Sequence, residues 1–517
     1  MSKGTLPSVF ATTIPAWNND QKQVALAYLF LFGRAPDTAG MNYWIGQTPG
    51  SSGSKTFVDA FRTLHNALGT SYFEPVNVPE GGGLYFFQDI YVHVLGRAVP
   101  DELNNLPSAP SGIQYWGKTL NEYSTPPRLA ESTLGGKRAR VCYDIYNILA
   151  ANPAPDDLAY NRFLILEGVV RAQLYYGRDL SYQTSETITR MVVDTTTSFD
   201  DAMSVVTSRI INNSTPPTNQ WFKNYTQSVI AAEAIVSRYD NFATNNTKIH
   251  KYLAWWNRNG DLLLAHAFLP ASFASISSNT QRCVISLHGG GWRGATIERL
   301  QSYNTLLAGA SAVPVVLAPA MRLSRYSYIF PAAYNDLEDF KALVEASATM
   351  LRINTAKISY FGESSGAHLV LLLGSKVNAG RVFSLYAPVD LTNLTVSQYP
   401  GYDSSPADLR PYINYFTGEN CADGSAGSNE IAASPYHQWS NARTTVFQLW
   451  HGDHDGLVPV ANATSFQNHL NASSSGKITV HIVTNGVHGF DDPIDATNPT
   501  HATRNEVVAA ANAMFTA

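Results

Sequence analysis

Three residues of different chemistry stand in an informative order in the last third of the chain: a serine, an aspartate and a histidine. Ser364 is the centre of Gly-Glu-Ser-Ser-Gly, the only Gly-x-Ser-x-Gly pattern in the sequence. Asp455 lies in HGDHDGLVP and His488 lies in VTNGVHGF. A serine becomes a strong nucleophile when a histidine takes its proton and a carboxylate orients that histidine. The order Ser, Asp, His therefore predicts acyl-transfer chemistry on Ser364.

A run of glycines upstream could bind the negative charge that acyl transfer develops. The segment His288-Gly-Gly-Gly-Trp292 follows a short apolar stretch and begins 76 positions before Ser364 (364 − 288). Consecutive glycines let the backbone approach a substrate closely and turn its N–H groups toward it. Such donors stabilise the oxyanion of a tetrahedral intermediate, and we expect the Ser365 N–H to contribute as well.

The acidic residue has two candidates. Asp455 fits the HGxxDxxVP spacing of hydrolase acid loops and lies 33 positions before His488 (488 − 455). Asp453 is the alternative, and we prefer Asp455. We interpret His451 and His454 as residues that structure this loop.

The flanking sequence predicts the elements that position these residues. KISYF before the Gly-x-Ser-x-Gly pattern is typical of a strand, and AHLVLLLGS after it is typical of a helix. TTVFQLW precedes the acid loop and KITVHIV precedes His488, and both read as strands. From Tyr252 onward, short apolar runs alternate with helical stretches, which predicts βαβ units and a mostly parallel sheet.

Together these motifs resemble the hormone-sensitive-lipase-like esterases and their neighbours, the feruloyl and acetyl-xylan esterases and the arylformamidases. The resemblance spans about residues 253–517. Besides HGGGW and GESSG, it includes a stretch between positions 321 and 343 in which Arg322, Pro331, Ala332, Ala333 and Asp336 match. It implies an α/β-hydrolase fold, hydrolysis of carboxylic esters without metal or other cofactor, and N–H donors at Gly290, Gly291 and Ser365.

Two features depart from that family. GESSG stands where the family usually has GDSAG, and a serine at 365 leaves the backbone donor unchanged. A polar, aromatic stretch around 392–440 looks like an insertion before the strand that leads to the acid. Its aromatic residues could line an acyl or alcohol pocket, or they could form a small folded cap on the sheet: Tyr399, Tyr402, Tyr412, Tyr415 and Phe416.

The first half of the chain has a different pattern, so we expect an all-helical domain at 1–220 and the hydrolase domain at 221–517. AYLFLFGRAPDTAGMNYWIG (27–46) aligns with DIYVHVLGRAVPDE…GIQYWGK (89–118), and 143–163 looks like a degenerate third copy. Each unit reads as a helix, a turn and a second helix, since Gly ends helices and Pro-Asp opens them. Tyr43-Trp44 and Tyr115-Trp116 would then pack between units.

The repeats resemble a bacterial helical-repeat domain of unknown function that is found in secreted RTX-type proteins. That resemblance covers roughly residues 25–163. It implies a role in adhesion, localisation or assembly, with contact to a cell surface or polysaccharide. The alternative is a helical domain that only stabilises or oligomerises the enzyme.

Composition narrows the remaining choices. A net charge of −5 without a charged block gives no reason to expect nucleic-acid binding. No apolar run is long enough for a membrane span, and Cys142, Cys283 and Cys421 are too scattered for a metal or redox motif. The first residues contain no signal-peptide core, so we expect either a cytoplasmic protein or leaderless export, and the RTX-type resemblance favours the extracellular location.

The predicted function is hydrolysis of short-chain or aromatic acyl esters, with a small-molecule ester as partner. One alternative is amide or peptide cleavage of the prolyl-oligopeptidase type, because the acid-loop pattern is shared with those enzymes. The other is a surface-binding protein that carries the hydrolase as a passenger.

Overall fold

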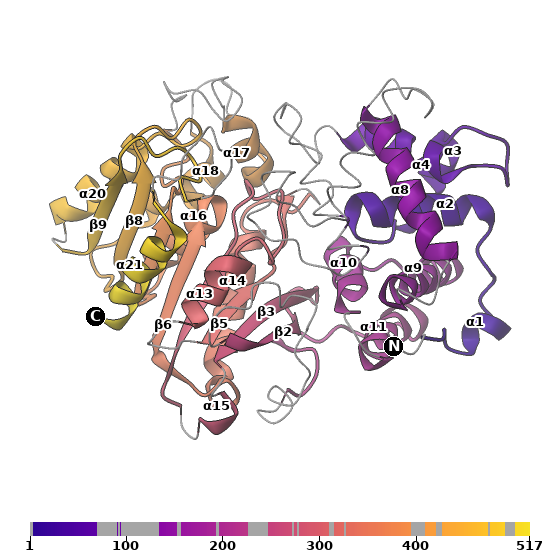
Figure 1. The fold of residues 1–517 in the computed structure, drawn as a ribbon, viewed down its shortest axis with the longest axis horizontal. Coiled ribbons are helices and arrows are strands. Elements are labelled where there is room, and N and C mark those ends of the chain that lie inside the picture. The colour runs from indigo at the N-terminus through magenta and orange to yellow at the C-terminus, as the bar shows by residue number, and fades with distance from the viewer. Residues whose placement is uncertain are drawn as a thin grey trace. The chain divides into compact units, whose positions relative to one another are not determined.

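The computed structural model divides the protein of 517 residues into two compact units. One comprises Met1–Val99, Leu103–Thr218 and Gly260–Leu262, and the other comprises the remaining residues. Figure 1 shows both as ribbons. The structure describes residues 4–69, 90, 94, 134–151, 157–192, 196–225, 247–270, 273–276, 279–309, 315–324, 327–393, 409–419, 426–473, 476–491 and 502–517.

Helices make up the described part of the first unit. They are α1 (Val9–Thr12), α2 (Asn19–Phe32), α3 (Thr38–Gln47), α4 (Phe57–Leu64), η1 (His65–Gly69), α8 (Leu134–Ala151), α9 (Asp157–Tyr176), α10 (Tyr182–Met191), α11 (Thr196–Val206) and η3 (Thr207–Ile211). The helical character predicted for the N-terminal part is confirmed.

The first predicted repeat corresponds to α2, a turn and α3. Gly33 ends α2 in a left-handed conformation with φ 67°, and the Asp37 side chain begins α3 by accepting the Gly40 N–H. Trp44 is buried, whereas Tyr43 is 57% exposed. The second copy, with Tyr115 and Trp116, lies outside the described residues except for positions 90 and 94, so the repeat remains a prediction.

The second unit is built on a nine-stranded sheet with the order β1-β2-β3-β5-β4-β6-β7-β8-β9. β3 is antiparallel to β5, and the pairs from β5 through β4 to β9 are all parallel. The strands are β1 (Gln220–Trp221), β2 (Thr247–Trp256), β3 (Leu262–Pro270), β4 (Gln281–Leu287), β5 (Val315–Pro319), β6 (Ile353–Glu363), β7 (Arg381–Leu385), β8 (Val446–Gly452) and β9 (Ile478–Val483). This order confirms the predicted α/β-hydrolase fold with a mostly parallel sheet.

Helices cover both faces of this sheet. α13 (Gln301–Ala308) and α21 (Arg504–Thr516) join one core cluster with Phe361, Phe383 and Trp450 of the strands. α14 (Ala332–Ala346) contacts α16 (Ser364–Lys376), and Gly374 of α16 packs on Phe447. Phe447 pairs with Val382, whose side chain points away from that of Phe383, so α16 covers the opposite face.

The remaining helices are short, apart from α20, and three of them belong to the predicted insertion. They are η5 (Phe273–Ser275), α15 (Ala348–Leu351), α17 (Arg410–Thr417), α18 (Ser428–Ala433), α19 (Pro435–Gln438) and α20 (Ala461–Ser473). α17, α18 and α19 fall within 392–440.

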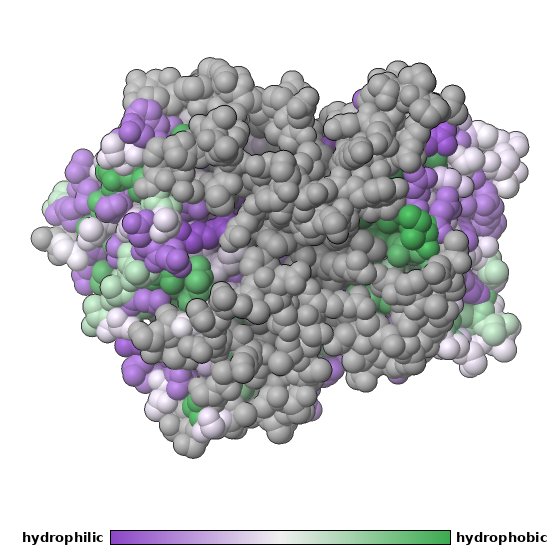
Figure 2. Space-filling model, viewed as in Figure 1, coloured by the Kyte–Doolittle hydropathy of each residue, from purple (hydrophilic) through white to green (hydrophobic). Residues whose placement is uncertain are grey.

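The described surface mixes hydrophilic and hydrophobic residues, as the coloured part of Figure 2 shows. Among the described helices, none has both the length and the apolar character needed to cross a membrane. Cys142 and Cys283 are both buried and free, and Cys421 lies outside the described ranges.

Candidate active site

The predicted nucleophile lies on a sharp turn between β6 and α16. β6 ends at Glu363 and α16 begins at Ser364, whose φ of 48° places it in the left-handed region. The chain is crowded around this turn, since a Cβ on Gly366 would lie 2.3 Å from the Leu287 carbonyl oxygen. A Cβ on Gly362 would lie 2.7 Å from the Ala367 nitrogen. Glycine is therefore needed at both flanks of the pattern.

The structure brings the predicted serine, histidine and aspartate into one hydrogen-bonded series. His488 Nε2 lies 3.1 Å from Ser364 Oγ, and His488 Nδ1 lies 2.9 Å from Asp455 Oδ2. A carboxylate only accepts hydrogen bonds, so Nδ1–H donates to Asp455 and Nε2 is left to accept from the serine hydroxyl. This arrangement can remove the proton from Ser364.

Asp455, and not Asp453, occupies the position beside the histidine. Its second oxygen, Oδ1, accepts the N–H groups of Leu457 and Val458, both at 2.8 Å. Burial alone would raise the pKa of Asp455, but the neighbouring His488 and His451 outweigh that effect and lower it. Asp455 therefore stays ionised well below neutral pH. Asp453 forms a partly exposed pair with His454 at 2.7 Å.

His451 has a closer connection to the acid than its sequence suggested. It is fully buried, its Nε2 lies 2.8 Å from the Val458 carbonyl oxygen, and the same atom lies 3.3 Å from Asp455 Oδ2. Nε2–H thus donates toward two oxygens of the acid loop. The signal in the sequence was its place at the first position of HGxxDxxVP.

The glycine loop after β4 lies directly beside the nucleophile. A Cβ on Gly289 would lie 3.0 Å from Ser364 Cβ, and Gly290 and Gly291 have φ of 112° and 60°. The Gly290 carbonyl accepts the N–H groups of Arg293 and Gly294 at 3.1 and 2.8 Å, which closes the turn. Within the described part of the chain, the N–H groups of Gly290 and Gly291 have no acceptor. The Ser365 N–H is in the first turn of α16, where helical N–H groups lack partners.

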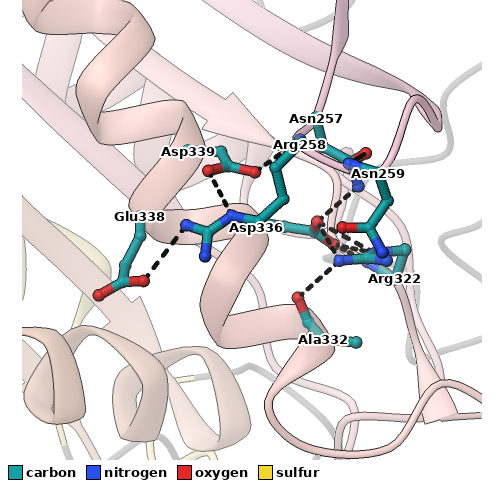
Figure 3. Close-up of polar contacts among 8 residues, drawn as sticks. All are labelled: Asn257, Arg258, Asn259, Arg322, Ala332, Asp336, Glu338 and Asp339. Carbon is teal, nitrogen blue, oxygen red and sulfur yellow. Dashed lines mark hydrogen bonds and ion pairs between the residues drawn. The ribbon is translucent and has the colours of Figure 1, made fainter. Parts of the chain in front are cut away.

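The segment after β5 contains Arg322, which pairs with the buried Asp336 in the ionic network of Figure 3. The backbone and side chain of Arg322 donate to Asp336 at 2.8 to 3.0 Å, and Asn257 Nδ2 donates to the same carboxylate at 2.8 Å. Burial raises the pKa of Asp336 to about 6, although Arg322 favours its ionised form. Two residues further on, the Ser324 N–H donates to the Trp292 carbonyl at 2.9 Å. The predicted match at Arg322 and Asp336 thus corresponds to a brace for the glycine loop.

Aromatic residues of α17 cover the other side of the loop. The Phe416 ring stacks on Trp292 at 4.6 Å, and Trp292 Nε1 donates to His368 Nδ1 at 3.2 Å. His368 Nε2 in turn donates to the Ala433 carbonyl at 2.8 Å, and burial lowers the pKa of His368 to about 3. His368 is therefore a neutral structural histidine.

Tyr412 approaches the loop most closely. A Cβ on Gly291 would lie 2.5 Å from its ring, and Tyr415 lies under the Arg293 guanidinium at 4.0 Å. α17 therefore packs as part of a folded cap, with Tyr412 as its residue beside a predicted N–H donor. Tyr399 and Tyr402 lie outside the described residues.

Among the comparisons with known proteins, one family model matches this part of the chain. The family model BD-FAE matches residues 272–470, which include the glycine loop, Ser364 and the acid loop. This region is a carboxylic ester hydrolase domain. No curated protein matches the chain.

Several solved structures are similar to part of this chain. An esterase from Pyrobaculum calidifontis is 19% identical, with 54% of this chain and 89% of that chain covered and a TM-score of 0.44. A thermophilic esterase from Thermogutta terrifontis is 17% identical, with 52% and 93% covered and a TM-score of 0.42. An acetyl ester-xyloside bifunctional hydrolase from Caldicellulosiruptor lactoaceticus is 20% identical, with 44% and 80% covered and a TM-score of 0.36.

Proposed function

We propose that the protein is a serine carboxylesterase that forms an acyl-enzyme on Ser364 and acts on short-chain or aromatic acyl esters. The observation that carries this proposal is the hydrogen-bonded series from Asp455 through His488 to Ser364, which ends beside the glycine loop. The assignment of an esterase domain indicates the class of reaction, and the hydrogen-bonded series indicates the residues that would carry it out.

In the first half-reaction, Ser364 Oγ attacks the ester carbonyl carbon while its proton passes to His488 Nε2. The carbonyl oxygen becomes an oxyanion that accepts hydrogen bonds from the N–H groups of Gly290, Gly291 and Ser365. Asp455 stabilises the imidazolium that has formed. When the C–O bond breaks, Nε2–H protonates the leaving alcohol and the acyl group remains on Ser364.

In the second half-reaction, His488 Nε2 takes a proton from water, and the hydroxide attacks the acyl carbon. A second oxyanion forms at the same N–H groups. Its collapse releases the carboxylic acid, and the proton on Nε2 returns to Ser364 Oγ. Over the two half-reactions, an ester and a water molecule give a carboxylic acid and an alcohol. These steps use only side chains and backbone N–H groups of the protein, without a metal or other cofactor.

The preference for short or aromatic acyl groups is supported by the crowding at the glycine loop. The Tyr412 ring packs against Gly291 and is mostly buried, so that an acyl group bound near this donor meets an aromatic surface. Flat or short groups fit beside such a ring with little rearrangement.

For the domain at 1–220 we propose an accessory role, in localisation or assembly. Its described residues form helices, and the hydrogen-bonded series that carries the chemistry lies wholly in the second unit. The domain would then determine the location of the esterase, through contact with a cell surface or polysaccharide.

A substrate comparison with the purified full chain tests the proposed reaction. We expect release of p-nitrophenol from acetate and butyrate esters and turnover of methyl cinnamate, with much slower cleavage of the matching p-nitroanilides. Faster cleavage of the anilides would favour the amide-hydrolase alternative. Absence of turnover on every ester would contradict the proposal and favour the surface-binding alternative.

A further inference from the structure

Glu363, the residue before the nucleophile, makes three polar contacts although its side chain is almost completely buried. Oε1 accepts the Gly289 N–H at 3.0 Å and also accepts Arg299 Nε–H. Oε2 accepts the Tyr386 hydroxyl at 3.2 Å. One carboxylate thus connects the glycine loop after β4, the end of β6 and the residue that follows β7.

Tyr386 carries this connection to the histidine. It follows β7 directly, with a left-handed φ of 40°, and its N–H donates to the Trp450 carbonyl at 2.8 Å. Its ring lies against the His488 imidazole with the centroids 4.7 Å apart and the planes at 61°. On its other side it contacts Phe490 at 5.4 Å. Because the backbone and the hydroxyl are both held, the ring provides a fixed wall for His488.

The charge on Glu363 suits this role. Burial would raise its pKa, but Arg299 and the Gly289 N–H outweigh that effect and bring the pKa below its usual value, with His288 adding to the lowering. An ionised carboxylate only accepts hydrogen bonds, so it can hold the Gly289 N–H and the Tyr386 O–H at the same time. Hydrogen bonds to a charged acceptor are about twice as strong as neutral ones.

We propose that Glu363 is a positioning residue that couples the two halves of the catalytic machinery: it fixes the glycine loop through the Gly289 N–H, and it fixes the His488 ring through Tyr386. The inference rests on the proposed serine-esterase function and adds a role for Glu363 and for Tyr386, which belongs to none of its motifs. Neither Glu363 nor Tyr386 takes part in bond making. Each acts through the group that it holds.

Substitution of Glu363 by glutamine tests the coupling with little change in volume. The amide has one acceptor oxygen in place of two, so it cannot accept from Gly289, Arg299 and Tyr386 together. Loss of one oxyanion donor costs about 10²- to 10³-fold in kcat. Glu363→Gln removes no donor and only loosens the groups that Glu363 holds, so we expect a smaller fall in kcat, of about 10- to 10²-fold, with little change in KM. Glu363→Asp keeps the charge and should recover part of the loss.

The partner variant is Tyr386→Phe, which removes only the hydroxyl and keeps the ring beside His488. The lost hydrogen bond has a charged acceptor and is therefore a strong one, so we expect kcat to fall by about tenfold. The double variant is the decisive comparison. If Glu363 acts on the histidine through Tyr386, its loss should be close to that of Glu363→Gln alone; independent residues would give the product of the two losses.

Four controls separate positioning from simple damage to the fold. Glu345→Gln is the matched control, since Glu345 lies on α14 and pairs with Lys341 at 2.7 Å; it should leave kcat unchanged. Thermal unfolding and the count of serines labelled by a fluorophosphonate should match the wild type in Glu363→Gln. The inhibition constant of a trifluoromethyl ketone, which mimics the tetrahedral intermediate, should rise in parallel with the fall in kcat/KM.

Different results would contradict the proposed function and the positioning role of Glu363. If the wild-type chain turns over no ester, the proposed function is wrong. If the wild type is active, then unchanged kcat in Glu363→Gln or multiplied losses in the double variant would overturn the positioning role. Should Glu363→Gln fail to fold, Tyr386→Phe still decides, because a normal kcat in that variant would contradict the coupling.

Discussion

Ser364 is held in a backbone conformation that most side chains avoid. Its φ of 48° costs a non-glycine residue about 1 to 2 kcal/mol. The surrounding turn fixes it there, because Gly362 and Gly366 press against backbone on both sides. Strain of this kind belongs to the position and is independent of the hydroxyl.

Ser364→Gly and Ser364→Ala should therefore differ in stability although both abolish turnover. Glycine relieves the strain of the left-handed backbone, which stabilises the folded state. It also gives the unfolded chain more conformational freedom, which acts in the opposite direction. We expect the glycine variant to unfold at a higher temperature than the alanine variant, by an amount equivalent to about 1 kcal/mol. Calorimetry on the two variants measures this, and a lower midpoint for glycine would show that the turn is unstrained.

The choice between the two aspartates gives a second test. Asp455→Asn should lower kcat by about 10⁴-fold, because an asparagine no longer fixes the histidine tautomer. Asp453→Asn is the matched control and should stay close to wild-type activity, since Asp453 only pairs with His454 at the surface. A larger loss in Asp453→Asn would reverse the assignment.

Stability against pH should report the ionisation of Asp455. Its pKa is lowered from an ordinary 3.8 in the folded protein, so the unfolded chain binds the proton more readily. The stabilisation is fully present above about pH 4 and is lost as the pH falls through the lower, folded value. We expect the stability margin of the wild type over Asp455→Asn to begin to shrink below about pH 4, which unfolding midpoints from pH 7 to pH 3 would measure. A margin that grows in acid would contradict the assigned direction.

At the scale of residues, the motifs predicted the three residues that form the hydrogen-bonded series, because each of them lies in a recognisable motif and the three follow in the expected order along the chain. Ser364 begins the helix that directly follows β6, and Asp455 and His488 lie in the loops after β8 and β9. Glu363 could be read from its pattern only as a departure from the family. Tyr386 belongs to no motif, and its connection to Glu363 depends on β7 lying beside β6.

At the scale of elements, the glycine loop depends on the segment after β5. Arg322 and Asp336 are both almost completely buried, and their pairing fixes the chain two residues before Ser324. Removing one partner of a buried ion pair leaves an uncompensated charge. The same change at a partly exposed pair has a small effect.

Arg322→Met should therefore destabilise the protein by about 3 to 5 kcal/mol and also reduce esterase activity, because Ser324 then holds Trp292 less firmly. Lys341→Met is the matched control. Lys341 pairs with Glu345 on α14 where their side chains are 22% and 38% exposed, so its loss should cost about 1 kcal/mol or less. Urea unfolding followed together with ester turnover measures both effects. Equal costs for the two variants would mean that the buried Arg322–Asp336 pair of Figure 3 stabilises the fold no more than a partly exposed ion pair does.

The sequence predicted the parallel core of the sheet from its alternating apolar and helical segments. It could not decide how the insertion at 392–440 packs, because aromatic residues suit a pocket wall and a folded cap equally well. The structure places Phe416 against Trp292 and Tyr412 against Gly291. Only contacts between distant segments could distinguish these arrangements.

At the scale of the whole molecule, the chain separates into units of different construction. The second unit contains the sheet and each residue of the hydrogen-bonded series. We expect residues 219–517 produced alone to fold and to hydrolyse p-nitrophenyl butyrate with kcat/KM close to that of the full chain. An insoluble or inactive fragment would mean that the helical unit completes the enzyme, and the accessory role would have to be abandoned.

In the proposed mechanism Ser364 carries the acyl group, and covalent labelling tests this assignment most directly. A fluorophosphonate should add one phosphonyl group to the wild-type chain, at Ser364, and abolish ester turnover. Ser364→Ala should take up no label and lose about 10⁴-fold or more in kcat. Ser375→Ala, on the same helix, should behave like the wild type. Label or undiminished turnover in Ser364→Ala would contradict the account.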